Sequence, residues 1–193
     1  MKIKFAIYFL LLFSLFAFNS CNRNSGRRHG KINTPTIEKK ESIKQDSGNQ
    51  VKVVGITDGD TFKGLTSDYQ EIKFRIYGID SPERKQAFSN RAKQYLSDLI
   101  YGKTVEVKLH RKDRYGRSIV WIFTEDGRDV SAEMLKAGMA WHYKEYDSTQ
   151  QYSDLEYEAR LLKAGLWVDK NPKAPWDFRK EKKKKKSKET QTD

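Results

Sequence analysis

The sequence has one cysteine, three histidines and no apolar run long enough to cross a bilayer comfortably. The single cysteine, Cys21, cannot form a disulfide within the chain. The histidines, His29, His110 and His142, are scattered without the spacing of metal ligands, so a zinc or histidine-based metal site has no support. The longest apolar run, residues 5–18, would extend only about 21 Å as a helix, against roughly 30 Å of hydrocarbon in a bilayer.

Residues 1–21 have the pattern of an export signal peptide. Lys2 and Lys4 precede the apolar run, and Asn19-Ser20-Cys21 follows it. This ending is similar to a bacterial lipoprotein signal, in which Cys21 would be lipidated and become the first residue of the mature protein. Phe18 and Asn19 differ from the residues usual before such a cysteine, which leaves plain cleavage or a retained anchor as alternatives. In each case we expect the rest of the chain to be exported.

The formal net charge of +12 lies mostly at the two ends of the chain. Residues 22–50 contain seven basic and three acidic side chains but no aromatic one, so we predict a flexible linker with a reach of roughly 30 Å. Residues 180–193, with the lysine run 182–186, are predicted to be a disordered basic tail, either simply solvated or weakly attracted to nucleic acid or anionic lipid. The segment between these ends is nearly neutral, so net charge alone is a poor argument for any polyanionic ligand.

Residues 51–179 are predicted to form one α+β domain. Alternating apolar residues predict strands at 51–56, 61–65, 72–77, 105–109 and 118–124, and helical spacing predicts helices at 87–100, 130–137 and 149–163. Asp58-Gly59 is expected to supply positive φ angles to a hairpin turn. Leu166-Trp167 and Pro175-Trp176 are expected to seal the strands against the helices, with stacking on nucleic-acid bases as the alternative role for the tryptophans.

Three short motifs and an intervening arginine carry the chemistry. The motifs are Asp58-Gly59-Asp60-Thr61, Ile79-Asp80-Ser81-Pro82-Glu83 and Asp113-Arg114-Tyr115-Gly116-Arg117, and the arginine is Arg75. Two carboxylates such as Asp60 and Asp80 would repel by about 4 kcal/mol at roughly 4 Å, and a divalent cation removes that repulsion. Oxygen ligands without nearby His or Cys favour Ca²⁺ or Mg²⁺, and arginines beside such a cation suit a phosphodiester.

In this order the motifs resemble those of the thermonuclease (staphylococcal nuclease-like) family, over roughly residues 51–179. The resemblance implies an OB-type barrel of five strands with three helices packed against it. It also implies Ca²⁺ held by Asp60, Asp80 and the backbone carbonyl of Ser81, with Asp58 nearby and Thr61 supporting the metal loop. The family often has threonine at position 81, and a ligand from the backbone tolerates that exchange.

The resemblance also implies catalytic roles. Arg75 and Arg117 match the two arginines that bind the phosphate. Glu83 matches the carboxylate that handles the attacking water, either as general base or by positioning it. Tyr115 is expected to contact a terminal phosphate or a base edge, or else to be a residue of the barrel rim.

We therefore expect an exported, monomeric, Ca²⁺-dependent nuclease that hydrolyses DNA and RNA and leaves 3′-phosphate ends. Its lipid anchor at Cys21 would hold it on the periplasmic or cell-surface face of the envelope, unless it is released. The alternatives are a non-catalytic nucleic-acid-binding barrel at the cell envelope, or a passive envelope component. The presence of all the carboxylates and arginines argues against both.

Overall fold

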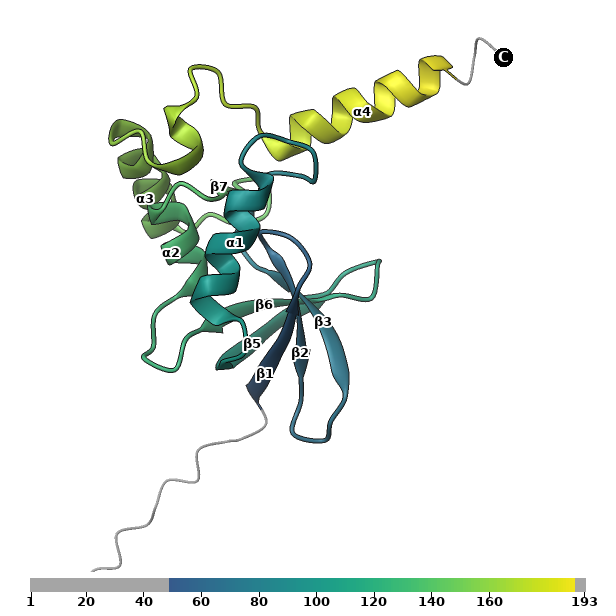
Figure 1. The fold of residues 1–193 in the computed structure, drawn as a ribbon, viewed down its shortest axis with the longest axis vertical. Coiled ribbons are helices and arrows are strands. Elements are labelled where there is room, and N and C mark those ends of the chain that lie inside the picture. Colours follow the sequence, from purple (N-terminus) through teal and green to yellow (C-terminus); the bar gives the residue numbers. More distant parts are fainter. Residues whose placement is uncertain (1–48, 190–193) are drawn as a thin grey trace, which may run out of the picture. The chain divides into compact units, whose positions relative to one another are not determined.

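The computed structural model describes residues 49–189, drawn in Figure 1. The expected signal peptide, Cys21 and nearly all of the expected linker lie outside the described residues, as do residues 190–193. The strands are β1 (Gln50–Ile56), β2 (Thr61–Leu65), β3 (Glu71–Ile76), β4 (Ile79–Asp80), β5 (Thr104–Lys112), β6 (Ser118–Phe123) and β7 (Trp141–His142). The helices are α1 (Ser89–Ile100), α2 (Val130–Lys136), α3 (Gln150–Leu161), the 3₁₀ helix η2 (Gly165–Val168) and α4 (Pro175–Glu189).

Five strands close into a barrel in the order β1-β2-β3-β6-β5, which confirms the predicted architecture. Neighbouring strands are antiparallel except β3 and β6, which run parallel with Arg75 opposite Ile119. The barrel interior is filled by apolar side chains from every strand, and Phe62 stacks on Phe74 with 5.1 Å between ring centroids. Closure leaves no strand of the barrel with an unpaired edge.

Helices α1, α2 and α3 (Figure 1) match the three predicted helices. Apolar side chains of α1 and α2 belong to the barrel core. Helix α1 begins two residues later than predicted, because Phe88 has a left-handed backbone with φ 65°. Asp129 caps α2 by accepting hydrogen bonds from the backbone of Ser131 and Ala132, and it also accepts one from the Tyr152 hydroxyl on α3. This carboxylate therefore ties α2 to α3.

The tryptophans form a second apolar cluster. Trp141, Trp167 and Trp176 pack together with Leu166 and Ala174, apart from the cluster that fills the barrel. The predicted core role for the tryptophans is confirmed, but they seal β7 to η2 and the start of α4, and the barrel has its own core. The Arg160 guanidinium lies 3.7 Å from the Trp167 ring centroid, a cation–π contact that covers this cluster.

The short sheet formed by β4 and β7 was not predicted. It pairs Asp80 with Trp141, so the strand that carries Asp80 is fixed to the tryptophan cluster. His142, the next residue of β7, is buried between Asp147 and Ser153, with its Nε2 atom 2.7 Å from the Asp147 carboxylate and its Nδ1 atom 3.0 Å from the Ser153 hydroxyl. These contacts fasten β7 to the turn before α3 and to α3 itself.

Residues 180–189 differ from the expected disordered tail, because α4 continues to Glu189. The helix begins at Pro175, a residue favoured at a first helical position, and lysine is a good helix former. Asp177 in the first turn and the lysines of the last turn suit the helix dipole, and Lys173 pairs with Glu181 at 2.8 Å. These local effects offset the repulsion among the lysines. No helix within residues 49–189 is long and apolar enough to span a membrane.

Candidate active site

The loop between β1 and β2 is shaped by close packing and not by the predicted left-handed glycine. Gly59 is absent from the positive-φ residues of the described chain, so the expected tight Asp-Gly turn is wrong. A Cβ atom at Gly59 would lie 2.8 Å from the side chains of Ala92 and Ser81. Glycine is needed here because the loop passes directly against α1 and the end of β4, which brings Asp60 next to Ser81.

Asp60 is buried, and both of its carboxylate oxygens accept hydrogen bonds. Its Oδ2 atom accepts hydrogen bonds from the Ser81 backbone N–H at 2.8 Å and from the Ser81 hydroxyl at 2.9 Å. Its Oδ1 atom accepts one from the Thr61 hydroxyl at 3.0 Å, and Asp58 accepts one from the Asp60 backbone N–H at 3.1 Å. The loop and the end of β4 thus hold this carboxylate in one orientation.

Arg75 joins the two predicted metal-binding carboxylates. Its Nη1 atom lies 3.0 Å from Asp60 Oδ2, and its Nη2 atom lies 3.1 Å from Asp80 Oδ1. Asp80 is only 2% exposed, so its charge needs such a partner. One guanidinium group therefore holds Asp60 and Asp80 on the same side of the barrel.

Arg179 of α4 is a second partner, which the sequence analysis did not identify. Its guanidinium binds both Asp80 oxygens, with Nη1 3.1 Å from Oδ1 and Nη2 2.7 Å from Oδ2. The same Nη1 donates to Glu83 at 2.6 Å. Arg179 lies 99 residues after Asp80 in the chain, and only the fold brings the two together.

The pKa values of the carboxyl groups are shifted in opposite directions. Burial and the Asp60 charge raise the pKa of Asp58 to about 7. Burial alone would raise the pKa of Asp60, but the Arg75 guanidinium and the hydrogen bonds from Ser81 lower it below its ordinary value. Burial raises the pKa of Asp80, the Asp60 charge adds to the rise, and Arg179 opposes it. The site thus concentrates acidic groups that need positive charge nearby.

Arg117 lies in the loop between β5 and β6. Its Nε atom donates to Asp113 Oδ2 at 2.7 Å, and its backbone N–H donates to Asp113 Oδ1 at 2.9 Å. Arg117 directly precedes β6, and Arg75 of β3 lies opposite Ile119 of β6, so the two arginines come from neighbouring parallel strands and the loop that enters one of them. This bond uses Nε, so the two terminal nitrogens stand outside the ion pair with Asp113 and keep the paired donors that suit an anion.

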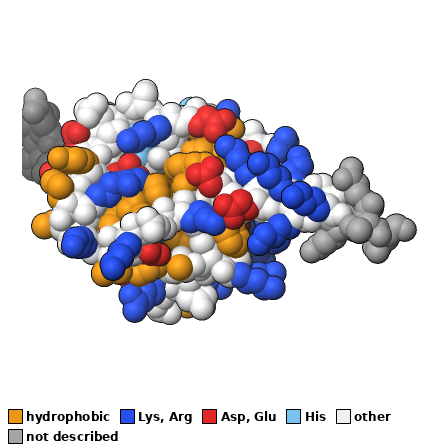
Figure 2. Space-filling model, turned by 90° about the horizontal axis from the view of Figure 1, so that it is seen from above, with side chains coloured by type: hydrophobic (Ala, Val, Ile, Leu, Met, Phe, Trp, Pro, Cys, Tyr) orange, Lys and Arg blue, Asp and Glu red, His pale blue; other side chains and the backbone are white. Residues whose placement is uncertain are grey.

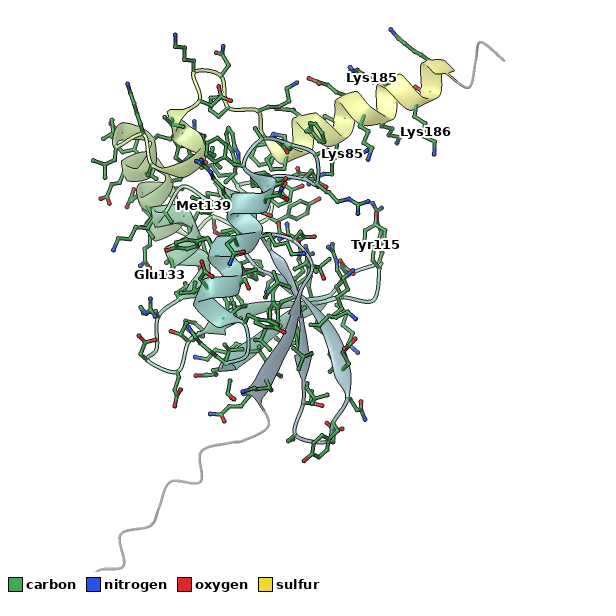
Figure 3. All side chains as sticks on the ribbon, viewed as in Figure 1. Lys85, Tyr115, Glu133, Met139, Lys185 and Lys186 are labelled. Atoms are coloured by element: carbon green, nitrogen blue, oxygen red, sulfur yellow. The ribbon has the colours of Figure 1, made fainter. Side chains whose placement is uncertain are left out.

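Tyr115 is at the tip of the same loop, as Figure 3 shows. Its side chain is 68% exposed. Arg114 and Arg117 lie 5.0 Å and 5.6 Å from its ring centroid. The ring is therefore held between two cations and is not packed into the barrel, which places it where a ligand could reach it.

The predicted Ca²⁺ ligands fit a hard cation in their chemistry. Asp60 and Asp80 lie together on one guanidinium group, and Ser81 lies against Asp60, so these residues offer only oxygen ligands. The four carboxyl groups Asp58, Asp60, Asp80 and Glu83 outnumber the two neighbouring guanidinium groups. Among residues 49–189, no group of three or more His, Cys, Asp or Glu side chains already has the arrangement of a metal site. The carboxylates are instead oriented by Arg75 and Arg179.

Comparisons with known proteins place the chain among nuclease homologues. The family model for staphylococcal nuclease homologues matches residues 73–169, which include Arg75, Asp80, Glu83 and Arg117. A protein of Haemophilus influenzae named as an uncharacterized endonuclease is 40% identical over 70% of this chain and 75% of its own length. A protein of Escherichia coli O157:H7 with the same name is 38% identical over 66% of this chain and 83% of its own. The micrococcal nuclease of Shigella flexneri is 38% identical over 66% and 79%, respectively.

Proposed function

Because this chain belongs to the staphylococcal nuclease family, we propose that it is a nuclease that hydrolyses phosphodiester bonds of DNA and RNA with the help of Ca²⁺. The observation that carries the proposal is the grouping of Asp60, Asp80 and Glu83 around Arg75 and Arg179. A non-catalytic binding module would have no use for so many buried charges, since each is costly without a partner.

In the proposed reaction a water oxygen attacks phosphorus, and the bond from phosphorus to the 5′ oxygen breaks. Glu83 accepts the proton of that water, or holds the water in line if the proton leaves by another route. Arg75 and Arg117 donate hydrogen bonds to the phosphate oxygens as negative charge increases in the transition state. The 5′ oxygen leaves and takes a proton from solvent water to become a hydroxyl, Glu83 returns its proton to solvent, and the phosphate remains on the 3′ oxygen.

Asp60, Asp80 and the Ser81 carbonyl would hold the Ca²⁺ ion. When bound, the ion would supply positive charge that neutralises the phosphate oxygens. Thr61 and the Ser81 side chain hold Asp60 in the required orientation by the hydrogen bonds described above. Asp58 lies next to this carboxylate and would add negative charge when ionised.

The metal assignment predicts that chelation abolishes hydrolysis of plasmid DNA and that added Ca²⁺ restores it. Asp60→Asn keeps the side-chain shape but removes a charge, so Ca²⁺ binding measured by calorimetry and hydrolysis should both be lost. Asp98→Asn, on the exposed surface of α1, is the matched control and should keep both. Undiminished cleavage in excess chelator would show that the metal assignment is wrong. If the protein bound DNA but did not cleave it with or without Ca²⁺, the non-catalytic module would be favoured.

We also propose that the protein is exported and held at the cell envelope by a lipid on Cys21. The support is the sequence pattern of residues 1–21, which lie outside the described residues. Cys21→Ser should either block processing of the signal or release the mature protein into the soluble fraction, because several acyl chains on Cys21 would be the anchor. Fractionation of cells with a high-salt wash tests this. A processed Cys21→Ser protein that stays on the membrane after the wash would exclude lipidation as the anchor.

A further inference from the structure

A groove of about 550 Å³ lies beside the candidate active site. The loop between β4 and α1 forms one side of it, and α4 forms the other. The lining residues are Glu83, Arg84 and Lys85 from the loop, and Phe178, Arg179, Lys182, Lys183 and Lys186 from the helix. The groove therefore begins at the carboxylate proposed to handle water.

The groove is lined by six cationic side chains and one acidic one. The α4 members, Arg179, Lys182, Lys183 and Lys186, follow the spacing i, i+3, i+4 and i+7, so they form one face of the helix. In Figure 3, Lys186 lies on the side of α4 toward the loop that carries Tyr115, whereas Lys185 lies on the other side. Figure 2 shows Lys and Arg side chains crowded on this part of the surface, with acidic side chains beside them.

Arg179 fixes this face of α4 against the site. Its bonds to Asp80 and Glu83 hold the second turn of the helix at the reaction centre, and the following turns carry Lys182, Lys183 and Lys186 along the groove. The match to the family model ends at residue 169, before α4 begins.

We propose that this groove binds the phosphodiester backbone of the nucleic-acid strand that is being cleaved. The inference rests on the proposed function, since continuity with Glu83 is what favours a nucleic acid over another polyanion. Lysine is a flexible point charge that pairs with phosphate without reading the base, so the groove would strengthen binding of long strands with little sequence preference. Anionic lipid is the competing ligand for a basic helix, and it is tested below.

The test measures binding of a fluorescein-labelled single-stranded 12-mer, by anisotropy with the full chain in chelator, over a range of salt concentrations. Lys182→Gln/Lys183→Gln removes two charges from the groove face. Lys184→Gln/Lys185→Gln removes two charges from the other side of the same helix and is the matched control. Glutamine keeps helix propensity, which circular dichroism checks. We expect the groove pair to raise Kd at low salt on the order of tenfold or more and to flatten the salt slope by about 1.4, and the control to do neither.

Two further measurements use a dinucleotide, which competes with the 12-mer for the site, and vesicles of anionic lipid. The affinity gained on lengthening the strand from two to twelve nucleotides should be lost in the groove pair and retained in the control pair. Equal losses in both pairs, or in neither, would overturn the proposal. It would also be overturned if the groove pair lost binding to phosphatidylglycerol vesicles but kept the 12-mer. The binding assay is run in chelator and does not depend on hydrolysis. A protein without nuclease activity could therefore still show the expected binding, so the nuclease proposal and the groove proposal can fail independently.

Discussion

Glu83→Gln is expected to lower the rate of phosphodiester hydrolysis on the order of 10²–10⁴-fold while Ca²⁺ binding persists. Glutamine can still accept the hydrogen bond that Arg179 Nη1 donates to Glu83, so α4 should keep its place. What the amide cannot do is accept the proton of the attacking water. Steady-state cleavage of a fluorogenic oligonucleotide, with Ca²⁺ binding measured in parallel, gives both quantities.

Glu71→Gln is the matched control for this variant, because Glu71 pairs with Lys63 on the exposed surface of the barrel. It should leave the cleavage rate unchanged, since an exposed ion pair contributes at most about 1 kcal/mol to stability. A near-normal rate in Glu83→Gln, with the circular dichroism spectrum unchanged, would remove Glu83 from the mechanism.

Arg117→Lys is expected to reduce kcat by roughly 10²–10³-fold, or about 2.7–4 kcal/mol of transition-state stabilisation. The structure explains the expected size of the loss. Arg117 binds Asp113 through Nε, and this bond aims the terminal nitrogens as a rigid pair. Lysine keeps the charge but has neither the second terminal donor nor the bond that orients it.

Arg114→Lys is the control, because Arg114 lies in the same loop and its guanidinium contacts Tyr115 but makes no ion pair with Asp113. Its kcat should stay close to that of the unaltered chain. If Arg117→Lys raised KM and left kcat unchanged, Arg117 would position the substrate and would not stabilise the transition state.

The barrel could be predicted from the sequence because its strands alternate. Apolar residues at every second position, as at Ile72, Phe74 and Ile76, suffice to place β3, and the family resemblance, now confirmed, supplies the closure. Strands β4 and β7 were missed because two residues are too short to show a period. Helix α4 was missed because its lysine run has no apolar face, and the helix depends on residue propensity, the helix dipole and an ion pair.

The site was predictable only as a set of residue types. The motifs named Asp60, Arg75, Asp80, Glu83 and Arg117, and their roles remain predictions. The role of Gly59 was misjudged because a close approach to Ala92 and Ser81 is a tertiary contact that no local pattern records. Arg179 was missed for the same reason, since its partners lie 96 and 99 residues earlier in the chain.

The separation between Arg179 and Asp80 has a consequence for the order in which the protein is made. Asp80 lies in the first third of the domain and is almost fully buried, yet one of its two cationic partners is synthesised 99 residues later. A ribosome that stops between residues 124 and 178 releases a chain with every strand of the barrel but with an under-neutralised carboxylate inside it. The charge balance of Asp80 is therefore complete only once the C-terminal segment has been synthesised.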